Sequence, residues 1–155
     1  MSEITTRSAT INDLPTLLQF EQGVVTAERP YDPTLKAGPI NYYDLKALIA
    51  SADAEVVVAE TGNQVIGSGY ALVKTAKAFV DHERYAYLGF MFVPENFRGR
   101  GVNKKIIEHL KTWANSKGLV EIRLEVYTEN VSAIRAYEKV GFKGLLLEMR
   151  MEIEH

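Results

Sequence analysis

One stretch joins an apolar segment to a helix and carries an unusual charge: Phe92-Val93-Pro94-Glu95-Asn96-Phe97-Arg98-Gly99-Arg100-Gly101-Val102-Asn103-Lys104-Lys105. The apolar segment stops at Pro94, two glycines follow, and apolar residues at helical spacing predict a helix from Val102 to Lys117. Four cations crowd the start of this helix: Arg98, Arg100, Lys104 and Lys105. The first turn of a helix already has unpaired N–H groups and the positive end of the helix dipole. Cations at this end therefore indicate a bound anion such as phosphate.

Composition narrows the class of protein. The chain has 155 residues, with 18 basic and 20 acidic side chains, so one domain with its own core is expected. A near-neutral balance is unlike a nucleic-acid binder, and the local cation cluster fits a small anion better. Cysteine is absent, and His82, His109 and His155 lie far apart in the sequence. We therefore expect no disulfide, no cysteine nucleophile and no metal site.

The N-terminal residues lack the apolar core of a signal peptide, and no apolar run is long enough to cross a membrane. These features predict a cytoplasmic protein that does not bind membranes. The sequence leaves open whether the protein is a monomer or a homodimer.

The first half of the chain predicts a strand, two helices and a hairpin. A short strand over 4–9 precedes a helix that Asn12 or Asp13 caps and that reaches about Thr26. Prolines and glycine make 29–39 irregular, and Asn41 is expected to cap a second short helix. The strands 55–60 and 64–73 form the hairpin, in which Gly67 and Gly69 indicate a bend or a close backbone approach.

The second half predicts alternating strands and helices. An aromatic-rich strand over 85–93 leads to the helix over 102–117, which Gly118 ends in a left-handed conformation. A strand over 119–126, a helix from Asn130 to about Gly141 and a final strand over 145–153 follow. The strand–helix–strand order implies a parallel pair next to the antiparallel hairpin. The fold class is therefore α/β (α+β) with a mixed sheet.

Two motifs resemble those of the GNAT superfamily of acyl-CoA N-acyltransferases. Arg98-Gly99-Arg100-Gly101-Val102-Asn103 is similar to the pyrophosphate loop of that family, Arg/Gln-x-x-Gly-x-Gly/Ala. The segment Asn130-Val-Ser-Ala133-Ile-Arg-Ala-Tyr137-Glu-Lys-Val-Gly141-Phe142 is similar to the Asn-x-x-Ala…Tyr…Gly-Phe block. One departure is Asn103, where the family has Gly or Ala. Asn103 could shift the diphosphate or contact it through its amide.

The resemblance implies one GNAT domain over residues 1–155, with about six or seven strands and about four helices. It also implies that two central parallel strands splay apart to admit acetyl-CoA. The pantetheine arm would follow the backbone of the strand 85–93, and the diphosphate would lie on the N–H groups of the loop. The residues expected to bind acetyl-CoA are Phe90, Met91, Phe92, Val93, Arg98, Gly99, Arg100, Gly101, Val102, Asn103, Lys104, Asn130, Ala133 and Tyr137.

The same resemblance implies an N-acetyltransferase in which a primary amine attacks the thioester directly, with no covalent enzyme intermediate. Tyr137 matches the general acid, and Asn130 would orient its loop or contact the cosubstrate. The general base is open, because 85–93 contains no carboxylate. Glu83, Glu125 and Tyr87 are candidates, and a water relay or an amine that arrives neutral would also serve.

The missing strand carboxylate leaves room for an alternative, a non-catalytic acyl-CoA-binding sensor or interaction domain. The segments 26–44 and 74–84, where the acceptor side is expected, carry charges of both signs. They also contain Tyr31, Tyr42 and Tyr43, which could line the acceptor site or pin their loop. The sequence therefore does not identify the amine acceptor.

Overall fold

The computed structural model describes residues 3–154 of the chain. These residues fall into two compact units, 3–125 and 126–154, which are described separately below. The first unit contains a five-stranded sheet with the order β1-β2-β3-β4-β5. Its strands are β1 (Ile4–Ser8), β2 (Ala54–Thr61), β3 (Gln64–Thr75), β4 (Arg84–Phe92) and β5 (Ile122–Arg123).

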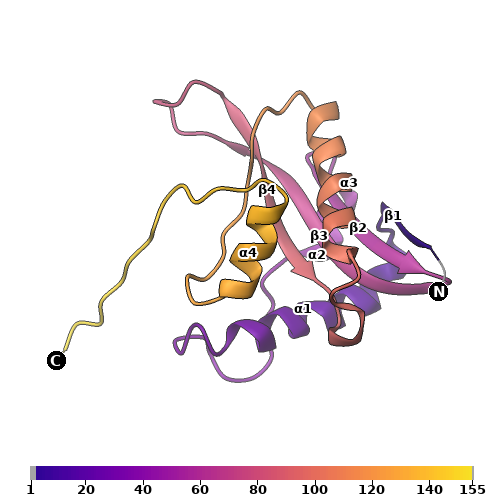
Figure 1. Cartoon of the computed structure of the whole chain (residues 1–155), viewed down its shortest axis with the longest axis horizontal. Coiled ribbons are helices and arrows are strands. Elements are labelled where there is room, and N and C mark those ends of the chain that lie inside the picture. The colour runs from indigo at the N-terminus through magenta and orange to yellow at the C-terminus, as the bar shows by residue number, and fades with distance from the viewer. Residues whose placement is uncertain (1–2, 155) are drawn as a thin grey trace. The chain divides into compact units, whose positions relative to one another are not determined.

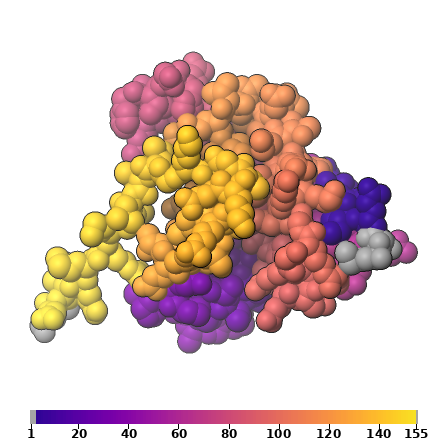
Figure 2. Space-filling view, in the orientation of Figure 1, coloured from indigo at the N-terminus to yellow at the C-terminus, as the bar shows by residue number. Residues whose placement is uncertain are grey.

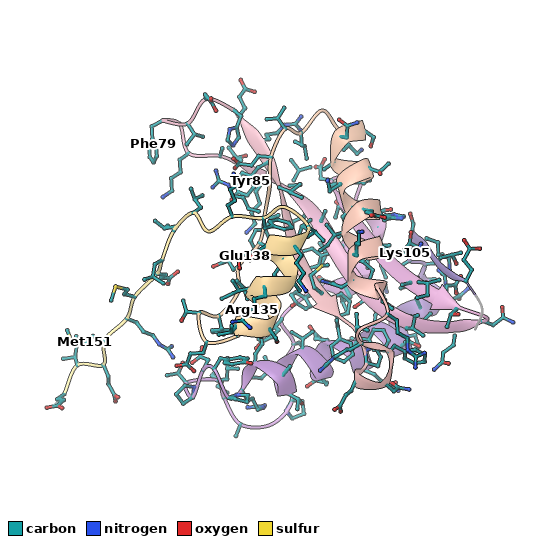
Figure 3. The ribbon with its side chains drawn as sticks, viewed as in Figure 1. Phe79, Tyr85, Lys105, Arg135, Glu138 and Met151 are labelled. Atoms are coloured by element: carbon teal, nitrogen blue, oxygen red, sulfur yellow. The ribbon has the colours of Figure 1, made fainter. Side chains whose placement is uncertain are left out.

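The strand directions match the expected mixed sheet. The first four strands pair antiparallel, whereas β4 and β5 pair in parallel through Ala86↔Ile122 and Tyr87↔Arg123. The connection between β4 and β5 contains helix α3 (Val102–Ser116), as a parallel pair requires. Arg123 also lies over the ring of Tyr85, which Figure 3 labels, and 4.3 Å separates the guanidinium carbon from the ring centroid.

Helices cover both faces of this sheet (Figure 1). On one face, α1 (Leu14–Glu28) and α2 (Leu45–Ala50) form a core with Tyr70 and Phe90. On the other face, α3 lies against Gly67 and Gly69, the positions of β3 that alternate with Tyr70. The strand alternation of β3 therefore separates the two packing layers.

The two glycines of β3 allow the close approach that was predicted for them. A Cβ atom added at Gly67 would lie 2.8 Å from a methyl group of Val102, and one at Gly69 would lie 2.8 Å from a methyl group of Ile106. Both distances are well inside van der Waals contact. Larger residues at these positions would push the start of α3 away from the sheet.

The β3–β4 pair contains a bulge that the sequence did not indicate. Ser68 pairs with Phe92 and Tyr70 pairs with Gly89, so β4 has one more residue than β3 in this interval. Within residues 3–154, Phe90 is the one non-glycine residue with positive φ, at 56°, and its side chain is buried. Such a conformation in a bulky residue marks a site whose shape the surrounding packing imposes.

The prediction that Asn41 caps the second helix is wrong. Asp44 is the N-cap of α2, and its carboxylate accepts a hydrogen bond from Ala47 N at 3.1 Å. Glu21 explains the shift, because its carboxylate accepts the N–H groups of Tyr42 and Tyr43 at 2.8 and 2.9 Å. Those bonds to α1 hold residues 42 and 43 outside the helix.

The second unit contains α4 (Val131–Lys139), which begins at the predicted N-cap Asn130. Gly141 follows the helix with φ of 109°, as expected for its stop. The predicted strand over 145–153 is wrong: this segment is extended and irregular, with Leu145, Leu147 and Met151 largely exposed (Figures 2 and 3). Alternating apolar residues give a strand only when a neighbouring edge completes its hydrogen bonds, and the described part of this unit provides none.

The sheet is therefore smaller than the six or seven strands expected. The predicted strand over 119–126 is also reduced to Ile122–Arg123, because the paired register with β4 ends at Tyr87↔Arg123. No helix within residues 3–154 is long and apolar enough to cross a membrane. No cluster of metal-ligating side chains occurs in the same residues.

Candidate functional site

The loop before α3 has the backbone that an anion site needs. Gly99 and Gly101 have φ of 77° and 80°, values that glycine adopts without strain. A Cβ atom at either glycine would meet nothing within 4 Å, so the space beside this backbone is open. Gly101 is the N-cap of α3, and no side chain caps this end in the part of the chain that the structure describes. The first N–H groups of α3 are thus accessible to an anion.

The four cations of this loop make different contacts and do not all lie in one place. Arg98 Nε donates to the carbonyl of Val93 at 2.8 Å, which ties the loop to the end of β4. The guanidinium of Arg100 lies 5.5 Å from the ring of Phe97, and Lys104 is exposed. Lys105 instead lines a hollow of about 590 Å³ beside β1, on another face of α3 (Figure 3). Arg98, Arg100 and Lys104 remain candidates for the anion site.

Some residues expected to bind acetyl-CoA have buried side chains. Val102 is only 2% exposed and contacts β3, so only its backbone can face a ligand. Phe90 is also 2% exposed, and Phe92 packs against Phe20 with 5.1 Å between ring centroids. Asn103 is partly exposed. Phe90 can therefore offer a ligand only its backbone, whereas Met91 and Val93 are partly exposed.

The bulge at Phe90 is held from two sides. Ser68 is fully buried, and its hydroxyl donates to the carbonyl of Phe90 at 3.1 Å. The hydroxyl of Tyr43 forms a hydrogen bond with the backbone of Phe90. Burial raises the pKa of Tyr43, with further contributions from Tyr70 and Glu28, so this hydroxyl stays protonated at neutral pH. The strained backbone is thereby fixed in one position.

Of the two candidate carboxylate bases, Glu125 contacts a tyrosine of β4. Glu125 follows β5 beyond its last paired residue, and its Oε1 accepts a hydrogen bond from the hydroxyl of Tyr87 at 2.6 Å. Glu83 precedes β4, six residues before the bulge at Gly89, a separation of about 20 Å along a strand. The structure therefore brings Glu125 together with Tyr87 and leaves Glu83 at the opposite end of β4.

Two tyrosines near Glu125 resist ionisation. Burial raises the pKa of Tyr87, and the hydrogen bond to Glu125 raises it further. Burial also raises the pKa of Tyr70, with an added contribution from the charge of Glu125. At neutral pH both hydroxyls are therefore protonated, and that of Tyr87 donates its hydrogen bond to Glu125.

Sequence reasoning missed three residues on the α1 side of the site: Glu21, Glu28 and Tyr70. The ring of Tyr70 lies 5.3 Å from that of Tyr43 and perpendicular to it. A Cβ atom at Gly89 would come within 2.6 Å of the Tyr70 hydroxyl, so this hydroxyl lies directly over the bulge. Glu21 offered one signal, because it interrupts the apolar helical stripe of α1 yet is fully buried.

The second motif, Asn130 to Phe142, forms helix α4 and the turn that follows it, all within the second unit. Asn130 Oδ1 accepts a hydrogen bond from Ala133 N at 3.3 Å, so these two residues start the helix. The rings of Tyr137 and Phe142 meet edge to face at 5.7 Å, and Phe142 N donates to the Tyr137 carbonyl at 3.1 Å. The spacing of the second motif therefore shapes this helix and fixes the ring of Tyr137.

Parts of this chain are similar in sequence to known acetyltransferases. A streptothricin acetyltransferase of Escherichia coli is 44% identical over 57 residues, which are 37% of this chain and 33% of that protein. A thialysine N-epsilon-acetyltransferase of Bos taurus is 33% identical over 106 residues, 67% of this chain and 57% of that protein. The stretch matched in the E. coli relative is thus about a third of that relative's length.

Solved structures share the fold at low sequence identity. A predicted acetyltransferase from Clostridium acetobutylicum, solved with acetyl-CoA, is 18% identical with a TM-score of 0.72, and the match covers 96% of both chains. The glucosamine-6-phosphate N-acetyltransferase of Arabidopsis thaliana is 17% identical with a TM-score of 0.71, covering 98% of this chain and 99% of that one. The model of the acetyltransferase (GNAT) family matches residues 22–142, well over half of the sequence, and the chain belongs to this family.

Proposed function

We propose that this protein is an N-acetyltransferase that transfers the acetyl group of acetyl-CoA to a primary amine by direct attack. Family membership supports the reaction class. The observation that carries the proposal is the bulged strand β4 leading into a glycine loop and an uncapped helix start. This one continuous segment offers a fixed backbone for an extended thioester arm and N–H groups for a diphosphate.

The residues present fit acetyl-CoA. The open space at Gly99 and Gly101 admits a diphosphate, and Arg98, Arg100 and Lys104 supply its countercharge. The backbone from Phe90 to Val93 would hold the pantetheine amides. Asn103 stands where the family has a small residue, and its partly exposed amide can donate to the same anion. When bound, acetyl-CoA supplies an activated acetyl thioester.

Two side chains would move the protons. Glu125 takes a proton from the acceptor amine, directly or through one water, while the nitrogen forms its bond to the acetyl carbon. Tyr87 orients this carboxylate through its hydrogen bond of 2.6 Å. Tyr137 donates its hydroxyl proton to the leaving sulfur as the carbon–sulfur bond breaks. Edge-to-face contact with Phe142 restricts the orientation of its ring.

A panel of amines tests the proposal by CoA release. We expect release above the rate of acetyl-CoA hydrolysis with at least one amine. Replacing Tyr137 by Phe keeps the affinity for acetyl-CoA and lowers turnover about a hundredfold, the contribution typical of a positioned general acid. Tyr127→Phe, a substitution of the same kind outside the motif, is the matched control.

The alternative function, a non-catalytic acyl-CoA-binding sensor, gives a different result in this experiment. Acetyl-CoA would then bind in calorimetry, but no amine would increase the release of CoA. The feature behind this alternative was the absence of a strand carboxylate. The pairing of Glu125 with Tyr87 places a carboxylate beside β4 and favours the enzyme.

A further inference from the structure

Five aromatic residues and two carboxylates lie at or near the bulge of β4 within the first unit. Tyr43 is central, with ring centroids 5.6 Å from Tyr42, 5.3 Å from Tyr70 and 5.2 Å from Phe90. On the side of α1, Tyr42 lies close enough to Glu28 to influence the pKa of its carboxylate. On the side of β5, Tyr87 donates to Glu125.

Each of the two carboxylates has a tyrosine neighbour, and neither is paired with a cation within the described residues. The ion pairs formed within residues 3–154 involve neither Glu28 nor Glu125. Arg29, the cation next to Glu28 in sequence, donates instead to the carbonyls of Lys36 and Gly38. Glu28 is partly buried, and its burial together with nearby Asp32 outweighs Tyr42 and raises its pKa. A half-buried carboxylate of this kind is stabilised when a cation comes beside it.

The aromatic faces also suit a cation. The ammonium of Lys74 lies 4.0 Å from the ring centroid of Tyr87, well within the range of a cation–π contact. One tyrosine of this group thus already holds an alkylammonium group in the structure. Lys74 lies beside Tyr87, so it does not compensate the negative charge of the Glu28 carboxylate.

We propose that the acceptor is an aliphatic diamine, whose attacked amine lies near Glu125 and whose second ammonium lies near Glu28 among the tyrosines. This inference rests on the acetyltransferase function proposed above. The side of the site that holds Glu28 and Tyr42 selects for positive charge, so an acceptor that bears a carboxylate in place of the second ammonium is excluded by repulsion.

The test compares three amines of similar length under saturating acetyl-CoA: diaminopentane, pentylamine and aminohexanoate. They differ in the distal group, which is positive, apolar or negative. We expect kcat/KM to be highest for diaminopentane and lowest for aminohexanoate. In Glu28→Gln, the ratio of kcat/KM for diaminopentane to that for pentylamine falls about tenfold, the effect of losing one partly screened ion pair.

Glu108→Gln is the matched control, because Glu108 is exposed on α3 and lines the hollow on the other side of the sheet. This variant keeps the parental ratio, and thermal melting of both variants checks their folding. Equal kcat/KM values for diaminopentane and pentylamine, or an unchanged ratio in Glu28→Gln, would overturn the diamine inference and leave the acetyltransferase intact. CoA release with none of the amines, despite acetyl-CoA binding in calorimetry, would overturn both.

Discussion

Glu21 on α1 accepts the backbone N–H of Tyr43 at 2.9 Å, across 22 residues of sequence. The same Oε2 atom accepts the N–H of Tyr42 at 2.8 Å, and the Glu21 side chain is fully buried. One carboxylate thus holds the segment that carries both tyrosines of the proposed acceptor side. We expect Glu21 to position this segment without contacting the acceptor.

Replacing Glu21 by Leu leaves two backbone N–H groups without their acceptor. We expect the free energy of unfolding, measured with urea, to fall by about 2 to 6 kcal/mol, since each of the two unsatisfied donors costs about 1 to 3 kcal/mol. Glu21→Gln keeps an amide oxygen in place and loses less stability. Equal losses in the Leu and Gln variants would show that the hydrogen bonds to Tyr42 and Tyr43 contribute nothing.

Local signals predicted the elements around the anion site well. Helix α3 begins at the predicted residue and ends one residue early, because its apolar spacing and Gly118, with φ of 74°, both act locally. Asn130 likewise caps α4 as expected. Of the two expectations for Gly67 and Gly69, a bend or a close backbone approach, the structure shows the close approach.

Interactions between residues that are distant in the sequence account for the features that were predicted wrongly or not at all. The cap of α2 moved from Asn41 to Asp44 because Glu21 binds the intervening N–H groups, which no local pattern shows. The bulge at Phe90 depends on the register between β3 and β4, which is a property of the pair. The segment 145–153 alternates like a strand, but a strand also needs a partner edge.

The pH dependence of stability should reflect Asp13. Arg7 donates to both oxygens of this carboxylate, at 2.8 and 2.9 Å, and these bonds lower the pKa of Asp13 despite its burial. A lowered folded-state pKa contributes stability above the unfolded value of about 3.9, and this contribution is lost as the pH falls through the folded value. The gap in unfolding free energy between the parent and Asp13→Asn should therefore shrink in acid.

Urea unfolding of the parent and Asp13→Asn, from neutral pH down to about pH 2, measures this gap. Arg7→Met serves as the matched variant, because it removes the donor and keeps the carboxylate. It should weaken the acid dependence in the same range. A gap that stays constant with pH would contradict the role of the Arg7–Asp13 pair.

The loop cations should affect ligand binding more than folding. Replacing Arg98 and Arg100 by Ala removes two charges from the start of α3, and we expect calorimetry to show acetyl-CoA binding at least about tenfold weaker. The melting temperature without ligand should change by only about 3 °C, since Arg98 loses one exposed hydrogen bond to Val93. Lys46→Ala with Lys111→Ala, two exposed cations elsewhere, is the control. Equal affinity in both double variants would disprove the anion site.

The final prediction separates the two candidate bases. Glu125→Gln should lower kcat/KM at neutral pH about a hundredfold, because the acceptor amine then loses its proton acceptor. The deficit should shrink as the pH approaches the pKa of an alkyl amine, about 10, where the amine arrives already neutral.

Glu83→Gln is the matched control, since this exposed carboxylate lies at the other end of β4. Tyr87→Phe should give a smaller loss, because Glu125 remains but loses its 2.6 Å hydrogen bond. A deficit that is constant across pH, or one that appears in Glu83→Gln instead, would remove Glu125 from the proton-transfer role.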